Sequence, residues 1–552
     1  MPEKTITNHY RSHLLLLLGW IILGAILRFT NLAVKPPWSD EWATIVFSLG
    51  HSFQTIPLDT LISLNELLQP LTVEPVRSQA VVEHLMREST HPPLYFWLSH
   101  WWLQLSGEGL VSIWWARSLS ALLGVAAIPA MYCLGWLWFS NLVTAQFAAA
   151  LMAVSPLAIY LSQEARHYTL AILWVTASLT CLNLAVRSVL TRTKLSWWVV
   201  AIWFVVNSLG LATHYFFALT LVAETMVLFT YWLRDWRRSR AAYWLRIYLA
   251  IVATVSGSLI WVINWRGISN NQLTSWIFDG NPLADFFDPL IRLLVWWLTT
   301  IFVLPIEGVA DWIAIASGIV ALGFSIWSLP QGWRELKAIC RYSNSAIGIE
   351  ILWRFWLSAI ALILIVTYIF GADLTLSARF QFIYLPAFVL LVAVALAALW
   401  QHTHTARGKP VAIATLLLGL LGALTVVNNF AYQKVERPEL VVPEIVEVND
   451  VNTPVVIATL HQTHGQTGEL MSLAWQFQFY DLKPQFVLAH SDPGDNRATQ
   501  TLIDAISEVP RPFQLWLVNF FPDKKLKTQG CSAGDRPVKR ATGYTYQLYT
   551  CL

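Results

Sequence analysis

The stretch Leu14–Leu27, LLLLLGWIILGAIL, decides the fold class, because it is apolar throughout and carries no charged residue. A bilayer core requires about 20 apolar residues per helical span, and runs of this kind recur along most of the chain. An N-terminal run of this type can also be a signal peptide, but no small-residue cleavage site follows it and further apolar runs come after. We therefore expect the segment 12–30 to be a retained first membrane span.

The composition supports a membrane protein. Of the 552 residues, 56% are hydrophobic and only 12% are charged, whereas an ordinary soluble domain has about 25% charged residues. The 30 tryptophans fit this assignment, since indole rings favour the membrane interface. A net charge of +3 without a polybasic tract gives no reason to expect nucleic-acid binding.

Hydropathy predicts about eleven membrane-spanning helices. The candidate spans are 12–30, 114–138, 141–158, 166–186, 197–213, 216–233, 243–264, 308–329, 351–370, 382–400 and 410–430. We expect a polytopic α-helical membrane protein, located in the plasma (inner) membrane.

Basic residues follow every second span and set the expected orientation. They occur before the first span and after the fourth, sixth, eighth and tenth, at Arg11, Arg187, Arg192, Lys194, Arg234, Arg237, Arg238, Arg240, Arg334, Lys337, Arg341, Arg407 and Lys409. The positive-inside rule places these groups, and the N-terminus, in the cytoplasm. An odd number of spans then places the C-terminus outside.

Two further apolar stretches, 94–105 and 283–303, complicate this count. Counting either one alone as a span would reverse the orientation of the basic loops downstream. We therefore expect both to be helices that lie along the membrane surface.

The topology predicts two domains. Residues 1–434 form the transmembrane domain, with a long external loop at 35–113, and residues 435–552 form an extracytoplasmic domain. Short β-like runs at 455–460, 485–489 and 514–519, and an amphipathic stretch at 469–479, suggest a small α/β fold for the latter. Cys531 and Cys551 are candidates for a disulfide in an oxidising compartment, and two free thiols are the alternative.

The first polar cluster, Lys35–Glu41, follows the first span and contains the adjacent carboxylates Asp40 and Glu41. Apolar surroundings and a neighbouring carboxylate both raise a carboxyl pKa, so a general base is plausible here. The alternative is a solvated pair, or a helix cap formed by Ser39 and Asp40.

The second cluster is His91-Pro92-Pro93, at the end of the same loop. His91 is a candidate ligand for phosphate or a metal ion. A histidine next to a helix start is also commonly structural, because the proline pair already fixes the backbone there.

The third cluster, Gln163-Glu164-Ala165-Arg166-His167-Tyr168, lies between the third and fourth predicted spans. Gln163, Arg166 and His167 have helical i, i+3, i+4 spacing, which places three polar groups on one face at the level of lipid headgroups. Arg166 is a candidate for bidentate phosphate binding. Snorkelling of its side chain to the interface is the alternative.

The fourth cluster, Ser377–Phe380 with Tyr384, precedes the tenth span and supplies a second arginine, Arg379. Two arginines opposite an acidic pair would bind a phosphate diester or pyrophosphate while a carboxylate deprotonates an acceptor. His214 is a further candidate for the lining of this site. Glu224, within a span, requires a partner.

The order of these clusters resembles the C-type membrane glycosyltransferases, in particular the glycosyltransferase family 39 group of protein mannosyltransferases and aminoarabinose transferases. The motifs that carry the resemblance are the acidic pair, His-Pro-Pro, Arg117-Ser-Leu-Ser-Ala-Leu-Leu-Gly, and Ser155-Pro156 with the third cluster. The resemblance covers about residues 10–430. It implies transfer of a sugar from a polyprenyl-phosphate donor to a lipid, glycan or protein acceptor on the outer face.

The resemblance also implies roles for individual residues. Asp40 corresponds to the family's catalytic base, with Glu41 beside it, in an inverting reaction. Arg166 and Arg379 would bind the donor phosphate. The residues expected to shape the pocket are His91, Gln163, Glu164, Tyr168, His214 and Tyr384.

Two departures from the family limit what the resemblance implies. His91 stands where aminoarabinose transferases often have lysine, and the C-terminal region does not resemble the carbohydrate-binding modules of eukaryotic protein mannosyltransferases. The sequence therefore names neither acceptor. It predicts no certain cofactor and leaves a divalent metal open. The alternative functions are a transporter or lipid flippase, with polar groups at mid-membrane, and a non-catalytic scaffold.

Overall fold

A computed structural model describes residues 2–238, 242–265, 272–342, 346–401, 408–449, 453–491, 497–522, 525–534 and 536–552. The predicted basic residues Arg240 and Arg407 lie outside these ranges. The chain forms two compact units. We call 1–32, 90–95 and 117–432 the helical unit, and 33–89, 96–116 and 433–552 the α/β unit. The predicted domain boundary between 434 and 435 stays a prediction.

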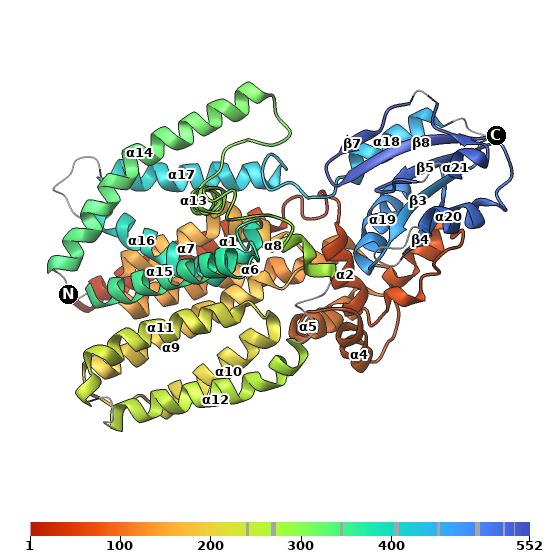
Figure 1. The fold of residues 1–552 in the computed structure, drawn as a ribbon. Helices are drawn as coiled ribbons and strands as arrows, with labels where there is room; N and C mark the ends of the chain where they lie inside the picture. Colours follow the sequence, from red (N-terminus) through yellow and green to blue (C-terminus); the bar gives the residue numbers. More distant parts are fainter. Residues whose placement is uncertain are drawn as a thin grey trace. The chain divides into compact units, whose positions relative to one another are not determined.

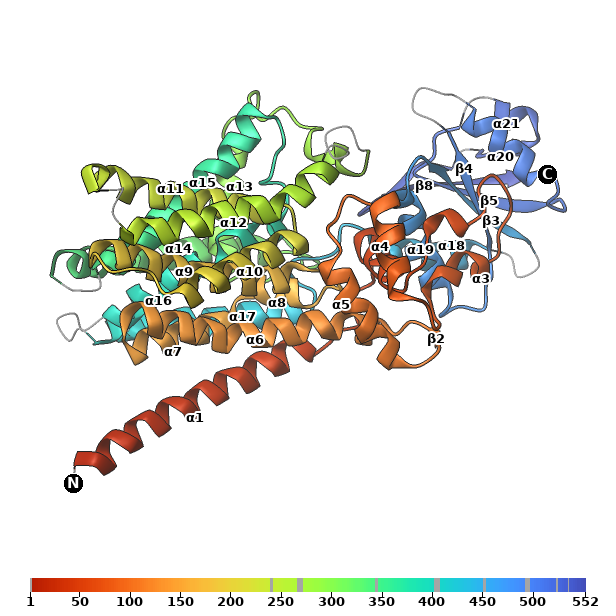
Figure 2. The same ribbon diagram turned by 90° about the horizontal axis from the view of Figure 1, so that it is seen from below.

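Long apolar helices make up the helical unit (Figures 1 and 2). They are α1 (Pro2–Phe29), α6 (Ile113–Phe139), α7 (Leu142–Val154), α8 (Pro156–Ser162), α9 (Tyr168–Leu190), α10 (Trp197–Thr213), α11 (Phe217–Arg234), α12 (Ala242–Trp265), α13 (Asp288–Ile301), α14 (Asp311–Tyr342), α15 (Ala346–Ile369), α16 (Leu385–Gln401) and α17 (Gly408–Val427), with 3₁₀ turns η4 (Trp236–Arg238), η5 (Gln272–Ile277) and η6 (Ala378–Ile383).

Each of the eleven predicted spans coincides with one of these helices or, at 141–158, with the pair α7–α8, whereas α13 was not predicted as a span. Among the described residues, eight helices are long and apolar enough to cross a membrane, and the bent pair α7–α8 would make a ninth. The shorter apolar helices α10 and α16 coincide with the remaining two predicted spans. The prediction of a polytopic, multi-pass membrane protein is confirmed.

The bend of 55° between α7 and α8 falls at Ser155-Pro156. A residue before proline is disfavoured in the α conformation, and Ser155 is extended, with ψ of 118°. Its Oγ accepts from the Ala158 backbone N–H and donates to the Thr300 carbonyl at 2.6 Å. The serine thus caps α8 and ties the break to α13.

The two ambiguous stretches form short helices. Residues 94–105 contain α5 (Leu94–Leu103), with 10 residues, and 283–303 contain α13, with 14 residues. About 20 residues are needed to cross a bilayer core, so both are shorter than a span. Their position on the membrane surface stays a prediction.

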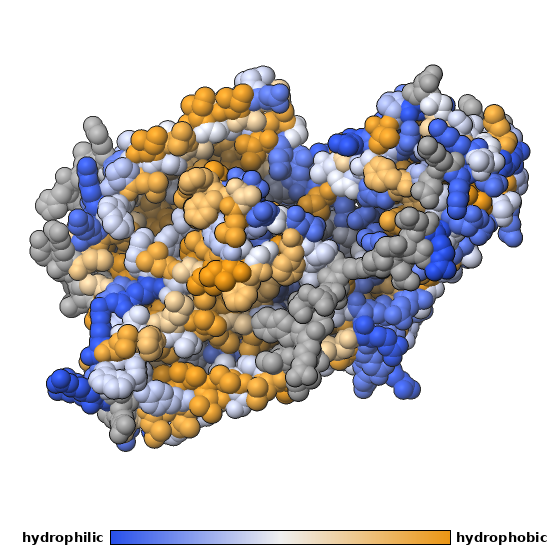
Figure 3. Space-filling view, viewed as in Figure 1, coloured by the Kyte–Doolittle hydropathy of each residue, from blue (hydrophilic) through white to orange (hydrophobic). Residues whose placement is uncertain are grey.

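Burial separates central from peripheral helices in the helical unit. In the most apolar window of α9, 72% of the residues are buried, against 6% for α14. Figure 3 shows hydrophobic side chains gathered over the exposed helices of this unit. An apolar surface of this extent is stable when lipid covers it.

The α/β unit contains a six-stranded mixed sheet with strand order β4-β3-β5-β8-β6, and β7 pairs with β8. Strands β3 and β4, and β3 and β5, are parallel, whereas β8 is antiparallel to β5. Parallel neighbours require crossover connections, which α19 and α20 supply. The predicted α/β fold of the C-terminal region is confirmed. The elements are α18 (Pro438–Val448), β3 (Val455–His461), α19 (His464–Phe477), β4 (Gln485–His490), α20 (Ala498–Ile506), β5 (Phe513–Val518), α21 (Lys525–Thr528), β6 (Cys531–Ser532), β7 (Lys539–Ala541) and β8 (Tyr544–Cys551).

Segments from the first loop complete this unit. Ile62 exchanges two backbone hydrogen bonds with Phe486 of β4 and extends the sheet by one bridge. Helix α2 packs against α19. The loop elements are α2 (Ser39–Ser48), η1 (Phe53–Thr55), α3 (Leu64–Leu68), η2 (Gln69–Leu71), β1 (Thr72–Val73), α4 (Ser78–Glu88), α5, η3 (Gln104–Ser106) and β2 (Gly109–Leu110).

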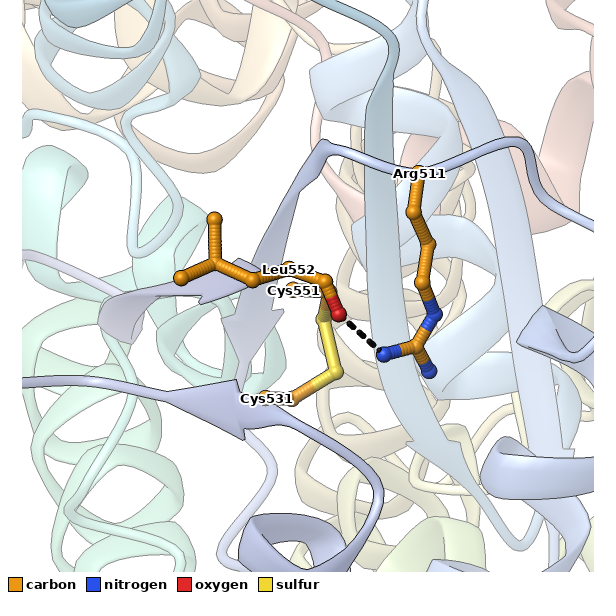
Figure 4. The surroundings of a disulfide bond; sticks show 4 residues. All are labelled: Arg511, Cys531, Cys551 and Leu552. Atoms are coloured by element: carbon orange, nitrogen blue, oxygen red, sulfur yellow. Dashed lines mark hydrogen bonds between the residues drawn. A yellow bond between two sulfur atoms is a disulfide. The ribbon is translucent and has the colours of Figure 1, made fainter.

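Cys531 and Cys551 form a disulfide between β6 and β8 (Figure 4). Nearby, Arg511 Nη1 donates to the Leu552 carbonyl at 2.6 Å. Of the two states that the sequence left open for these cysteines, the structure has the bonded one. Such a bond is typical of an oxidising compartment.

Candidate active site

Cationic and imidazole side chains from several connecting segments and helix ends of the helical unit lie close together. His91 precedes α5, His167 is the N-cap of α9, and His214 is the C-cap of α10. Arg166 Nη2 donates to Nε2 of His91 at 3.2 Å, and the His167 and His214 rings are 4.6 Å apart. With Arg379 from η6, we call these residues the His–Arg cluster.

Two histidines of this cluster, His167 and His214, are neutral near physiological pH. Burial, above all, holds the pKa of His167 well below its usual value, and the nearby His214 and arginines lower it further. Burial first, and then His91 and the two arginines, lower the pKa of His214. Nδ1 of His214 accepts the Phe216 backbone N–H at 3.0 Å, which places the proton of the neutral ring on Nε2. The positive charge of the cluster therefore comes from its arginines.

Residues 163–167 form a turn between α8 and α9, so the helical face predicted from the spacing of Gln163, Arg166 and His167 is wrong. This turn, which carries Arg166, is fixed on both sides. Ser120 Oγ of α6 donates to the Arg166 carbonyl at 2.8 Å and is itself bonded to the Tyr95 hydroxyl at 2.7 Å. The Gln163 amide donates to backbone carbonyls at the end of α1, at 2.9 Å for Thr30. Gln163 thus contributes to the site by holding the turn, and the fully buried Arg117 similarly donates to the Leu32 carbonyl at 2.9 Å.

Arg379 lies among aromatic rings. Its Cζ is 5.1 Å from the Trp276 ring centre and 5.6 Å from that of Phe380. Its charge acts on the pKa of both His167 and His214, which shows that it belongs to the same electrostatic environment. Only 9% of its surface is exposed, so its charge is weakly screened.

The other predicted pocket residues have defined surroundings. Tyr168 lies beside Arg166, whose Cζ is 5.8 Å from the ring centre. Glu164 is fully buried and hydrogen-bonds the Tyr160 hydroxyl. The Tyr384 hydroxyl donates to Gln381 and accepts from Trp297 Nε1 at 3.0 Å. Tyr384 therefore links η6, which carries Arg379, to α13.

The predicted acidic pair lies in the first turn of α2, in the α/β unit. Asp40 is half-buried, whereas Glu41 is 1% exposed. Glu41 pairs with the equally buried Lys434, at 3.3 Å between Oε2 and Nζ. The two neighbouring carboxylates thus have different environments, and Asp40 is the more accessible one.

A third carboxylate, Glu436, lies next to this turn. It accepts from the Ser39 backbone N–H at 3.0 Å, shares a hydrogen bond with Ser39 Oγ, and accepts from Ser472 Oγ at 3.1 Å. Burial first, and then the nearby Glu469, raise the pKa of Glu436 to about 8. Glu436 is therefore largely protonated near neutral pH.

His464, the first residue of α19, is close enough to Asp40 for the two charges to interact. Burial lowers the pKa of His464 to about 4, although the Asp40 carboxylate opposes this shift. The imidazole stacks on Phe53, with 5.0 Å between ring centres. His464 is consequently a neutral neighbour of Asp40 near physiological pH.

Glu224, the deep carboxyl group in α11, has partners within the helical unit. Oε2 accepts from Ser178 Oγ at 2.9 Å and from Trp203 Nε1 at 3.3 Å. It borders an apolar groove between α10, α11 and α12. A charged group at this depth costs free energy and usually has a function. The hydrogen bonds from Ser178 and Trp203 are equally consistent with a structural role for Glu224.

The part of the chain that the structure describes contains no group of side chains suited to bind a metal ion. Within it, no three His, Cys, Asp or Glu side chains are arranged to hold an ion. The divalent metal left open by the sequence is therefore assigned no ligands.

The sequence motifs identified His91, Arg166, His214 and Arg379, and the structure brings these together. Lys434, Glu436 and His464 were missed. The run Lys434-Val-Glu-Arg437, directly after the last span, was a visible signal, since charge clusters at the ends of spans often have partners. Their partners could not be found by spacing, because Ser39 and Glu436 are 397 residues apart.

Comparisons with known proteins give a similarity of fold. No protein-family model matches the sequence, and no curated protein matches it. The crystal structure of ArnT from Cupriavidus metallidurans in the apo state is similar over 96% of this chain and 98% of that chain, with a TM-score of 0.49 and 13% identity. The structure of ArnT bound to undecaprenyl phosphate gives 0.48 and 14%, over 96% and 97%. These values carry no weight for the chemistry, so the function is inferred from the chain's own residues.

Proposed function

We propose that this chain is an integral membrane glycosyltransferase of the C-type. It transfers a sugar from a polyprenyl-phosphate donor to a hydroxyl group of a lipid, glycan or protein acceptor. The observation that carries the proposal is the His–Arg cluster, in which two buried guanidinium groups lie near the neutral imidazoles of His167 and His214. Such a group of donors suits a phosphate, because guanidinium groups bind phosphate with charge-assisted hydrogen bonds.

The proposed reaction is a single displacement. Asp40 accepts the proton of the acceptor hydroxyl, whose oxygen attacks the anomeric carbon of the donor. The bond between that carbon and the phosphate oxygen breaks, and its electron pair leaves with the polyprenyl phosphate. Arg166 and Arg379 stabilise the charge on this leaving group, so no general acid is required, and the anomeric configuration inverts.

The proposed orientation follows from the positive-inside rule and the disulfide. The N-terminus is cytoplasmic, and the C-terminal residues 435–552 lie outside the plasma (inner) membrane. The disulfide Cys531–Cys551 suits that compartment. Donor and acceptor then meet at the outer face.

The test is transfer of a labelled sugar from polyprenyl-phosphate donors by purified full-length protein in lipid nanodiscs. We expect Arg166→Lys and Arg379→Lys to raise the donor KM and lower kcat, because lysine lacks the planar fork of donors. Arg234→Lys is the matched control, since Arg234 forms an exposed ion pair with Glu350. If Arg166→Lys and Arg379→Lys were as active as the control and the wild type, Arg166 and Arg379 would not belong to the donor site.

The transporter or flippase alternative has a different signature. It predicts movement of a polar lipid across the membrane without formation of a glycosidic bond. A wild-type protein that transfers no sugar from any donor, but moves a labelled lipid between leaflets in a Glu224-dependent way, would replace the glycosyltransferase by this alternative.

A further inference from the structure

The first turn of α2 lacks a local cap. Trp38 is its N-cap residue, and the side chain of Trp38 forms no capping hydrogen bond with the helix. The first backbone N–H groups of a helix have no partner within the helix. The Ser39 N–H, one of these groups, instead donates to Glu436 Oε2 at 3.0 Å. Glu436, which is 397 positions away in the sequence, thus caps this helix end in place of a local side chain.

A second contact holds the other side of Asp40. Glu41 is paired with Lys434, and both side chains are almost completely buried, at 1% and 2% exposure. The Lys434 ammonium also lies 5.9 Å from the centre of the Trp38 ring. Both flanks of Asp40 are therefore bound to the segment Gln433–Arg437, which we call the strap.

The strap is itself anchored to α19. Trp42 Nε1 donates to Ser472 Oγ at 2.8 Å, and Ser472 Oγ donates to Glu436. The two helices approach so closely that a Cβ at Gly468 would lie 3.0 Å from Ser39 Cα. The backbone of α2 around Asp40 is thus enclosed by the strap and by α19, whereas Asp40 itself remains half-buried.

We infer that the strap Gln433–Arg437 positions Asp40, through Glu436 bound to Ser39 and Lys434 bound to Glu41. The C-terminal part of the chain then has a role in the reaction, which is to fix the direction of the base rather than to bind an acceptor. Glu41, Lys434 and Glu436 are positioning residues in this scheme. The inference rests on the proposed role of Asp40 as general base.

The consequence for catalysis follows from geometry. A misplacement of about 1 Å at a reacting group can reduce the rate by about 100-fold. Removal of the Glu436 carboxyl group should let the first turn of α2 fray and let Asp40 leave its position. Substrate binding by the His–Arg cluster should not change, because that cluster involves other residues.

The experiment uses full-length protein in nanodiscs and compares Glu436→Leu, Glu436→Gln, Asp40→Asn and a control, Glu444→Leu. Glu444 forms an ion pair with Lys539 elsewhere in the α/β unit. We expect Glu436→Leu to lower kcat by about 100-fold with little change in donor KM. Glu436→Gln, which resembles the protonated acid, should restore kcat near neutral pH. Glu444→Leu should keep wild-type kinetics.

A measurement independent of activity accompanies the kinetics. Hydrogen exchange of the peptide that contains residues 39–42 should be faster in Glu436→Leu than in the wild type and in Glu444→Leu. Thermal unfolding checks that each variant is folded. Gly468→Val, which changes no charge, should speed exchange at the same peptide by displacing Ser39.

The outcomes separate the two ideas. If Asp40→Asn is inactive while Glu436→Leu keeps wild-type kcat and wild-type exchange, the strap does not position Asp40 and the inference fails. If Asp40→Asn is as active as the wild type, the proposed base is wrong. Faster exchange in Glu436→Leu would in that case show only that the strap clamps the turn.

Discussion

The His–Arg cluster and the first turn of α2, which contains Asp40, differ in which of their buried groups carry charge. In the cluster, positive charge comes from Arg166 and Arg379, and burial keeps His167 and His214 neutral. Around Asp40, charge is carried by carboxyl groups, and Glu436 has a pKa of about 8. The first region has a constant charge over the physiological range, whereas the second changes charge within it.

This difference suggests that the two regions have different roles in the proposed reaction. A site that binds a phosphate diester benefits from a charge that does not vary with pH, because the ligand's own charge is constant. A site that moves a proton requires groups that titrate near the working pH. The pH dependence of the enzyme should therefore come from the α/β unit.

The largest expected effect is that of Asp40→Asn. Loss of a general base lowers kcat by roughly 100- to 10,000-fold, while donor affinity should persist because the His–Arg cluster is unchanged. The measurement is kcat and donor KM for the purified variant. Asp504→Asn, at a surface position of α20, serves as the control. A rise in donor KM with unchanged kcat would move Asp40 from the base role to donor binding.

The next effect concerns stability and pH. The pKa of Glu436 is raised from 4.5 to about 8 in the folded protein, so the folded state holds a proton that the unfolded state loses above about pH 4.5. Folding stability from this group is therefore fully present below about pH 4.5 and is lost as pH rises to about 8, by up to about 5 kcal/mol. Thermal unfolding against pH measures it. Glu436→Gln should flatten this slope, and an equal slope in both proteins would contradict the assignment.

Lys434→Met should destabilise the α/β unit by about 3–5 kcal/mol, because it leaves the buried Glu41 carboxylate without its partner. Glu41→Gln combined with Lys434→Met should recover much of that loss, since no buried charge remains. Unfolding of both single variants and of the double variant gives the coupling between the two residues. Additive effects would show that the pair does not interact in solution.

The smallest effect is expected for donor binding as a function of pH. Because burial keeps His167 and His214 neutral, donor KM should change less than about two-fold between about pH 6 and pH 8. Initial rates at several donor concentrations test this. A ten-fold change centred near the ordinary histidine pKa would show that a ring of the cluster titrates, and would weaken the contrast between the two regions.

The fold was largely predictable because spans and strands have local signals. Each of the eleven apolar runs predicted as spans coincides with helix, and the β-like runs that begin at Val455 and Gln485 begin where β3 and β4 do. The bend at Ser155-Pro156 was not predicted, because the apolar run 141–158 continues through it and hydropathy alone does not report a break in a helix. The state of Cys531 and Cys551 was not decidable, because pairing depends on which strands lie side by side.

The candidate site was predictable only in part. Motifs indicated His91, Arg166 and Arg379 as candidates, but the helical spacing predicted for the third cluster was wrong, because residues 163–167 form a turn between α8 and α9. The pairing of Glu41 with Lys434 and of Ser39 with Glu436 joins residues nearly 400 positions apart, and no periodicity reports such a contact. The roles of Asp40 and of the two arginines remain predictions for the experiments above.

The α/β unit is assembled from separate parts of the sequence, since residues 33–89 and 96–116 precede most of the helical unit and residues 433–552 follow it. During synthesis at about 5–20 residues per second, roughly 15–60 seconds pass between completion of the first part and the start of the second. Through that interval Ile62 has no Phe486 to pair with, and the first turn of α2 has no Glu436. A nascent chain therefore contains Asp40 and Glu41 long before Lys434 and Glu436 are made, and the α/β unit is complete only after residues 433–552 have been added.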